Sequence, residues 1–115
     1  MNRKPGRDRR VIIESPYAGD VDANTDYARR CMADSLSRGE APFASHLLYT
    51  QPGVLDDTDP DERQDGIEAG LVWGRTADLT AVYVDHGVSA GMSQGILRAG
   101  VELRPVEYRK LEGSA

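Results

Sequence analysis

The sequence predicts an α/β fold of the flavodoxin or Rossmann-like type, a three-layer sandwich around a parallel four-stranded sheet. Short apolar, β-branched runs alternate with longer segments of helical periodicity, in the order β-α-β-α-β-α-β. Such alternation favours parallel strands joined by right-handed helical crossovers. The 115 residues suit one domain with one core. The expected strand order is 2-1-3-4, and ligands are then expected beyond the carboxyl ends of the first and third strands.

The first half of the chain supplies two of the expected strands and one helix. Residues 10–14 (RVIIE) predict a buried strand, and the proline and glycine within 15–20 end it. Apolar residues recur at helical spacing over 22–38, and Gly39 follows as a helix stop. Residues 42–46 (PFASH) predict a second short strand that reaches towards the two leucines after it.

A strong N-terminal signature opens the next helix, after a polar connection over 49–58. Asp59 can cap this helix, Pro60 occupies its first position, and Glu62 lies three residues after the cap. In this arrangement Asp59 and Glu62 satisfy free amides reciprocally. The helix is expected to end near Gly74.

The last third of the chain is expected to contribute two strands and a helix. Residues 78–84 form the clearest strand, because the run is almost continuously apolar. Ser89 can cap a helix over 90–99. A final strand over 101–108 is expected at the sheet edge, because Pro105 cannot donate a hydrogen bond to a neighbouring strand.

Composition and charge exclude several functional classes. The net charge is -5, but residues 1–10 hold five basic residues and one acidic residue, and the remainder holds nine basic against 18 acidic. Such an acidic body argues against nucleic acid as a partner. No apolar run approaches the ~20 residues of a membrane span, so no membrane partner is expected. Residues 11–13 are too short an apolar run for a secretory signal, and Cys31 has no internal partner. A cytoplasmic location is the default expectation.

These patterns divide the chain into three parts. Residues 1–9 are expected to form a disordered basic tail. Residues 10–109 are expected to form a single α/β domain of the nucleotide-binding kind, and 110–115 a flexible tail.

Residues 87–91 spell G-x-S-x-G, the pattern of a hydrolase nucleophile elbow. No histidine follows Ser89, since His46 and His86 both precede it, so a catalytic triad in the hydrolase order is not available. Gly87 instead permits a tight turn, Ser89 caps the helix, and Gly91 lets a ligand approach the backbone. The free amides of the first turn suit a phosphate or sugar hydroxyl. A helix cap without a ligand remains the alternative.

Two stretches carry a family resemblance. The first is Ser15-Pro16-Tyr17-Ala18-Gly19-Asp20 with Asn24, and the second is Asp85-x-Gly87-x-Ser89-x-Gly91-Met92. In this order the chain resembles the nucleoside 2-deoxyribosyltransferase-like superfamily over residues 10–108. Within that superfamily, the stretch from His46 to Gln51 and the later Pro60-x-x-Arg63 look like a subgroup of small uncharacterised domains from phages and actinobacteria.

The resemblance implies a flavodoxin-like fold, a nucleoside or nucleotide ligand, chemistry at the N-glycosidic bond, and oligomerisation. It also implies a glutamate nucleophile at the start of the helix after the third strand. This sequence has Ala90 or Gly91 there, and no glutamate occurs between Glu68 and Glu102.

Other carboxylates are therefore candidates for catalysis. Cleavage through an oxocarbenium-like transition state needs a carboxylate near the anomeric carbon and an acid for the leaving group. Asp20 and Asp85 end the converging loops, and Tyr17 could orient a substrate. The alternatives are a turn residue or helix cap for Asp20, and a loop residue bonded to its own turn for Asp85. For Glu14, at the end of the first strand, an inward polar group bonded to backbone is favoured over catalysis.

The expected ligand-binding residues lie in the converging loops and at the neighbouring element ends: Ser15, Pro16, Tyr17, Gly19, Asn24, His46, Arg63, Gly87, Ser89, Gly91 and Met92. No metal and no cofactor are expected, because the acidic segment 56–62 lacks the spacing of a calcium loop and is explained by a helix start. Trp73 and Tyr83 are expected in the core or in a subunit interface, which favours a homo-oligomer.

The sequence therefore predicts a small domain that binds a nucleoside or nucleotide and acts on an N-glycosidic bond. Whether it is an enzyme stays open at this point. One alternative is a non-catalytic sensor or sequestering module for a nucleotide, encoded by a phage. Another is an oligomeric structural protein.

Overall fold

The computed structural model describes residues 8–111. Most of the two expected tails, 1–7 and 112–115, lies outside the described residues. The sheet has four parallel strands, β1 (Arg10–Glu14), β2 (Ala41–Phe43), β3 (Leu79–Tyr83) and β4 (Val106–Arg109). The helices are α1 (Val21–Ser37), α2 (Ser45–Leu48), α3 (Pro60–Gly74) and α4 (Ala90–Val101).

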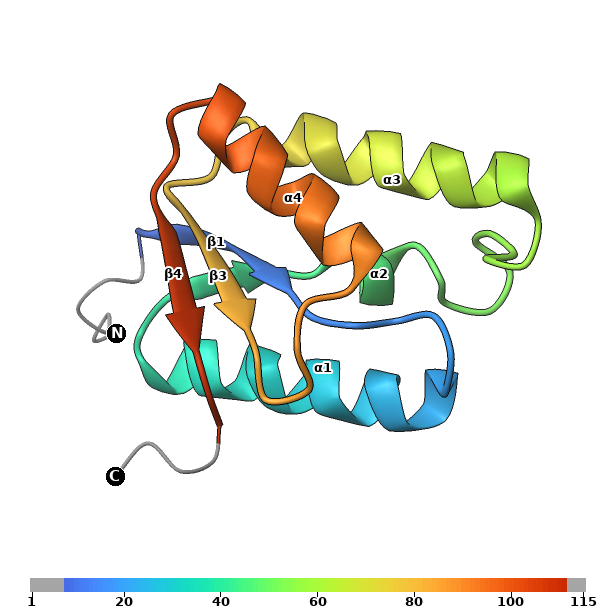
Figure 1. The fold of residues 1–115 in the computed structure, drawn as a ribbon, viewed down its shortest axis with the longest axis horizontal. Coiled ribbons are helices and arrows are strands. Elements are labelled where there is room, and N and C mark those ends of the chain that lie inside the picture. The colour runs from blue at the N-terminus through green and yellow to red at the C-terminus, as the bar shows by residue number, and fades with distance from the viewer. Residues whose placement is uncertain (1–7, 112–115) are drawn as a thin grey trace.

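The sheet order is β2-β1-β3-β4, which confirms the predicted fold class and topology. Figure 1 shows α1 on one face of the sheet and α3 with α4 on the other, so the molecule has three layers. Two neighbouring strands, β1 and β3, occupy the centre, and all five residues of β3 are buried.

Alternation along β1 assigns its side chains to two different environments. Val11 and Ile13 join the buried cluster that includes Tyr27 of α1. The even-numbered residues point the other way, so that Ile12 and Glu14 line a cavity under α3 and α4. The strand therefore directs an acidic side chain to the ligand side of the sheet.

Three helix starts have the caps that the sequence predicts. The Asp20 carboxylate accepts a hydrogen bond from the Ala23 amide at 3.2 Å, and Ser89 Oγ accepts one from the Met92 amide at 3.3 Å. Asp59 caps α3, with Pro60 at the first position. The prediction that Glu62 bonds back to the amide of Asp59 is wrong. The Glu62 carboxylate instead accepts a hydrogen bond from the amide of Asp56 at 3.1 Å.

Two element boundaries differ from the sequence prediction. The strand expected over 42–46 ends at Phe43, because the Ala44 carbonyl accepts from the amides of Leu47 and Leu48 and starts α2. The strand expected over 101–108 starts only at Val106. Its first part belongs to α4 and to a closing turn with Leu103 in the left-handed region, at φ 56°.

The two aromatic residues expected in the core or an interface have different environments. Tyr83 is fully buried in β3, as predicted for a core residue. Trp73 is 61% exposed on α3, so the prediction that it could lie in the core is wrong. One face of the end of α3 is thus exposed, although Gly74 at its last position is buried.

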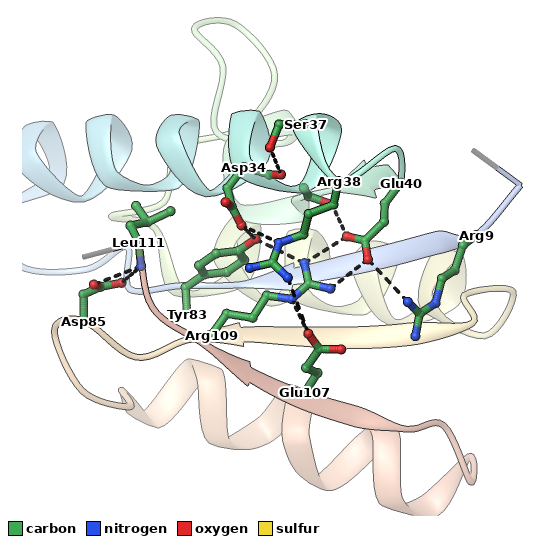
Figure 2. A network of polar contacts seen from close by, with 11 residues as sticks. Arg9, Asp34, Ser37, Arg38, Glu40, Tyr83, Asp85, Glu107, Arg109 and Leu111 are labelled. Carbon is green, nitrogen blue, oxygen red and sulfur yellow. Dashed lines mark hydrogen bonds and ion pairs between the residues drawn. The ribbon is translucent and has the colours of Figure 1, made fainter. Parts of the chain in front are cut away.

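A buried polar network joins the edge strand β4 to the end of α1 (Figure 2). Arg109 donates two hydrogen bonds to the carboxylate of Glu40, at 2.9 and 2.8 Å. Tyr83 donates to Asp34 at 2.6 Å, and Arg38 donates to the same Asp34 carboxylate at 2.8 Å. These charged groups satisfy one another on the α1 side of the sheet, and none of them lines the cavity on the other side.

Candidate functional site

A cavity of about 230 Å³ lies between the sheet, the short helix α2 and the helices α3 and α4. This volume is below the range of about 300–1,000 Å³ typical of sites for drug-sized ligands, so the cavity suits one small molecule. Its apolar lining suits a planar aromatic group, and a few polar side chains converge on it. The apolar side chains include Ile12, Phe43, Leu55, Ile67, Leu71 and Met92.

Glycines let α3 lie close over the neighbouring elements. Gly66, Gly70 and Gly74 recur at four-residue spacing and line the cavity. A Cβ atom on Gly70 would come within 2.6 Å of Ser45 Oγ, and one on Gly74 within 2.9 Å of Ile12 Cδ1. Since real Cβ contacts are not this short, the approach of α3 requires glycine at position 70, whereas a Cβ atom at position 74 would displace the terminal methyl group of Ile12.

Glu14 is the acidic group that β1 presents to the cavity. Among the described residues, none donates a hydrogen bond to its carboxyl group. The interpretation of Glu14 as bonded to backbone is therefore wrong. Its carboxyl group packs against α4 at Gly95, where any Cβ atom would overlap with it.

Burial raises the pKa of Glu14 to about 8, although the positive charge of Arg104 acts in the opposite direction. At pH 7 the side chain is therefore mainly a neutral carboxylic acid. A neutral acid of this kind can donate a proton to a ligand, and a perturbed pKa in a cavity is a feature of functional sites.

Next to Glu14, the side chains of Ser15 and His46 form a hydrogen-bonded polar pair. Ser15 Oγ and His46 Nε2 are hydrogen-bonded at 2.7 Å, and both residues line the cavity. Burial lowers the pKa of His46 to about 4, so its ring is neutral at pH 7. The ring of Tyr17 lies edge-on to His46, with centroids 6.4 Å apart. This corner thus offers neutral hydrogen-bonding groups next to an aromatic surface.

Arg104 lies at the opposite part of the lining, where its side chain is only 4% exposed. Its Nε donates to Thr80 Oγ1 at 2.9 Å. Its Nη1 donates to the Gly74 carbonyl at 2.8 Å and to the Glu102 carboxylate at 2.7 Å. These bonds hold the guanidinium in one orientation.

Of the predicted site residues, seven line the cavity together: Ser15, Tyr17, His46, Arg63, Ser89, Gly91 and Met92. Six others do not line it: Pro16, Gly19, Asp20, Asn24, Asp85 and Gly87. The loop after β1 and the start of α4 thus meet at one site, as the switch-point rule predicts.

Two residues outside the lining hold the loops in place. Asn24 donates to the carbonyls of Tyr17 and Ala18, at 2.9 and 3.1 Å. Asp85 accepts from the Tyr27 hydroxyl at 2.6 Å and from the Leu111 amide at 3.0 Å, and Figure 2 shows its carboxylate directed to the Leu111 amide.

Two backbone positions in these loops require glycine. Gly19 and Gly87 have φ values of 103° and 85°, which side chains rarely tolerate. Their contribution is therefore to the path of the loop.

Arg104 and Gly95 were missed by sequence reasoning. Strand alternation could have directed attention to Glu14, because its neighbours in β1 face the core. No local pattern distinguishes Arg104, whose role depends on the meeting of β3, α3 and the turn after α4. Gly95 is inconspicuous in a helix that also contains Gly91.

Within residues 8–111, no group of three or more His, Cys, Asp or Glu residues is placed to hold a metal ion. In the same part of the chain, no helix is long and apolar enough to cross a membrane.

Comparison with known proteins places the chain in a family. Residues 9–109 match DUF7768, a domain of unknown function, and the chain belongs to that family. No curated protein matches the sequence.

The fold is similar to a solved structure of the 2-deoxyribosyltransferase from the psychrotolerant bacterium Bacillus psychrosaccharolyticus, a biocatalyst for the synthesis of antiviral and antitumoral nucleosides. The TM-score is 0.63 at 17% identity, over 92% of this chain and 75% of that one. At this identity the likeness shows a shared fold.

Proposed function

We propose that this member of the DUF7768 family binds a nucleoside or nucleotide in the cavity and breaks its N-glycosidic bond, with Glu14 as the catalytic acid. The observation that carries the proposal is a half-buried acid that no described residue supplies with a hydrogen bond, in a small and mainly apolar cavity at the switch point of the sheet. The fold that the chain shares with a 2-deoxyribosyltransferase supports the choice of a nucleoside.

The chemistry of the bond matches a neutral carboxylic acid. The C–N bond breaks through an oxocarbenium-like transition state, and the electron pair of the bond goes to the departing base. A proton from Glu14 neutralises the charge that develops on the base. Water, or a second base in a transfer reaction, then attacks the anomeric carbon, and its proton restores the carboxylic acid. A pKa near the working pH favours such an acid.

The neighbouring groups have roles that follow from their positions. The neutral pair of Ser15 and His46 can bind a sugar hydroxyl or orient the attacking water. Tyr17 provides an aromatic surface at the same corner. The first-turn amides of Ala90 and Gly91 border the cavity, and they suit a hydroxyl or phosphate oxygen.

We place the reactive carboxyl group at Glu14 and not at Asp20 or Asp85. Asp20 caps α1, and Asp85 is bonded to the Tyr27 hydroxyl and the Leu111 amide. Neither borders the cavity.

The test is an incubation with deoxynucleosides and nucleotides, with free base measured by chromatography. The Glu14→Gln variant keeps the size of the side chain but has no acidic proton, and it should lose about 100- to 10,000-fold in rate. Asp20→Asn is the matched control, since asparagine is also a good helix cap, and its rate should be unchanged. Equal rates for Glu14→Gln and the unchanged protein would refute the role of Glu14.

A second candidate is a nucleotide-binding module without catalysis. The start of α4, at Ala90 and Gly91, carries no carboxylate where the resemblance implies a glutamate nucleophile. This function predicts a thermal shift with a nucleotide and intact compound after prolonged incubation.

Self-association is a separate part of the proposal. Val72 and Trp73 expose apolar surface side by side on α3, at 54% and 61%. Light scattering should give a mass above the 12.6 kDa of one chain. The Trp73→Ala variant should have a lower mass than the unchanged protein.

A further inference from the structure

The far end of the cavity contains a hydrogen-bond donor without an acceptor. Arg104 uses Nε and Nη1 for Thr80, Gly74 and Glu102. Among the described residues, Nη2 donates no hydrogen bond. Since no fully buried side-chain nitrogen in that part of the chain lacks a partner, Nη2 keeps some accessible surface, and Arg104 is a residue of the cavity lining.

The environment of this donor favours a neutral ligand group over an anion. The guanidinium is already paired with the Glu102 carboxylate at 2.7 Å, and the side chain of Glu102 is only 17% exposed. A phosphate or carboxylate would add a negative charge beside an existing one in a poorly hydrated place. A carbonyl oxygen accepts a hydrogen bond without that cost.

The rest of the lining indicates which part of the ligand lies there. Ile12 and Gly74 border the same end, and a Cβ atom on Gly74 would lie 3.9 Å from Nη2. This apolar end, level with Ile12 and Thr80 in the sheet, suits a flat ring. Ser15 follows the carboxyl end of β1 and is bonded to His46, and this polar pair suits a sugar.

We propose that the cavity selects nucleosides with an oxo-base, whose exocyclic carbonyl accepts a hydrogen bond from Arg104 Nη2. The base then lies between Arg104 and Glu14, and the sugar lies towards Ser15. This inference rests on the proposed nucleoside-binding function and adds its base preference. An amino group at the same ring position places a donor against a donor, so both stay unpaired.

The experiment compares pairs of ligands in which an exocyclic oxo group replaces an amino group and the adjacent ring nitrogen changes from acceptor to donor. Titration calorimetry with the unchanged protein uses deoxyinosine against deoxyadenosine, and deoxyuridine against deoxycytidine. Chromatography after each titration checks that the compound is intact, and short incubations keep it so. In at least one pair, the oxo member should bind about 10- to 100-fold more tightly, which is the effect of one hydrogen bond to a charged donor.

A variant tests whether Arg104 is the source of the preference. Arg104→Lys keeps the charge but cannot make the same set of bonds, so the preference should fall towards equality while the amino member changes little. Circular dichroism checks its fold. If this variant does not fold, the comparison of ligands on the unchanged protein still decides.

The outcomes separate the two proposals. Binding without a preference for the oxo member in either pair would overturn the oxo-base preference and leave nucleoside binding intact. Binding of none of the four deoxynucleosides would overturn the oxo-base preference together with nucleoside binding. A preference that persists fully in a folded Arg104→Lys variant would also overturn the assignment to Arg104.

Discussion

Glu14 should make the stability of the folded protein depend on pH in a window where few other groups contribute. Burial raises its pKa from the ordinary 4.5 to about 8, so the folded state keeps a proton that the unfolded chain loses. The stabilisation is complete below pH 4.5 and disappears as the pH rises through 8. Replacement by glutamine removes the titration while it keeps a neutral side chain of similar size.

The useful window lies between pH 7 and 9. His46 is neutral in the folded state, with a pKa of about 4 against an ordinary 6.5, so it acts in the opposite direction but only below about pH 6.5. The interval from pH 7 to the Glu14 pKa of about 8 is one pH unit. A titration over one unit changes the free energy of unfolding by about 1.4 kcal/mol. Burial also raises the pKa of Cys31 to about 12, an effect that both proteins share.

Urea denaturation, followed by circular dichroism at pH 7, 8 and 9, measures the effect. The free energy of unfolding of the unchanged protein, relative to that of Glu14→Gln, should fall by about 1.4 kcal/mol across this range. Asp20→Asn serves as the control and should follow the unchanged protein. A constant difference between the unchanged protein and Glu14→Gln would mean that Glu14 is not held as a neutral acid, and the general-acid role would then lose its basis.

Two further predictions follow from packing. Gly95→Ala places a Cβ atom in the space of the Glu14 carboxyl group, so the rate of base release should fall about 100-fold through misplacement of the acid. Gly100→Ala, on the same helix but outside the cavity lining and with open space at its Cβ position, should be nearly unaffected. Equal rates for the two alanine variants would contradict this. Glu40→Gln removes the buried one of the two carboxylates paired with the Arg109 guanidinium and leaves only the exposed Glu107, so it should cost about 3 kcal/mol in urea denaturation; a loss under about 1 kcal/mol would show that the Glu40 pair is dispensable.

The parts of the fold that sequence reasoning predicted are those fixed by local chemistry. Asp59, Pro60 and Ser89 define helix starts within a few residues, and the apolar run of β3 defines the central strand. The order of the strands followed from alternation and the handedness of crossovers. Such signals depend only on neighbouring residues in the sequence, so they can be recognised without knowledge of the fold.

The errors arose where a contact distant in sequence decides the structure. Ser45 starts a short helix that packs under Gly70, so α2 replaces the end of an expected strand. Arg104 looks like a residue within an edge strand, yet its side chain is buried beneath α3 by bonds to Thr80 and Gly74. Secondary-structure propensity describes only neighbouring residues, so it cannot predict either contact, because the partners lie 24 or more residues apart in the sequence.

The candidate site also contains a feature that depends on a contact between residues distant in the sequence. The resemblance implies a glutamate at the start of the fourth helix, and the sequence has none there. In the structure a carboxyl group nevertheless lies against that helix, because Glu14 reaches it from β1 and Gly95 leaves room for it. The missing glutamate and the internal glycine are therefore two aspects of one arrangement. A side chain at Gly95 would exclude the acid, and without Glu14 the glycine would lose its steric reason. We expect other members of the family that carry an acid at the end of the first strand to keep glycine at the matching helix position, and a frequent pairing of that acid with a larger residue would contradict the arrangement.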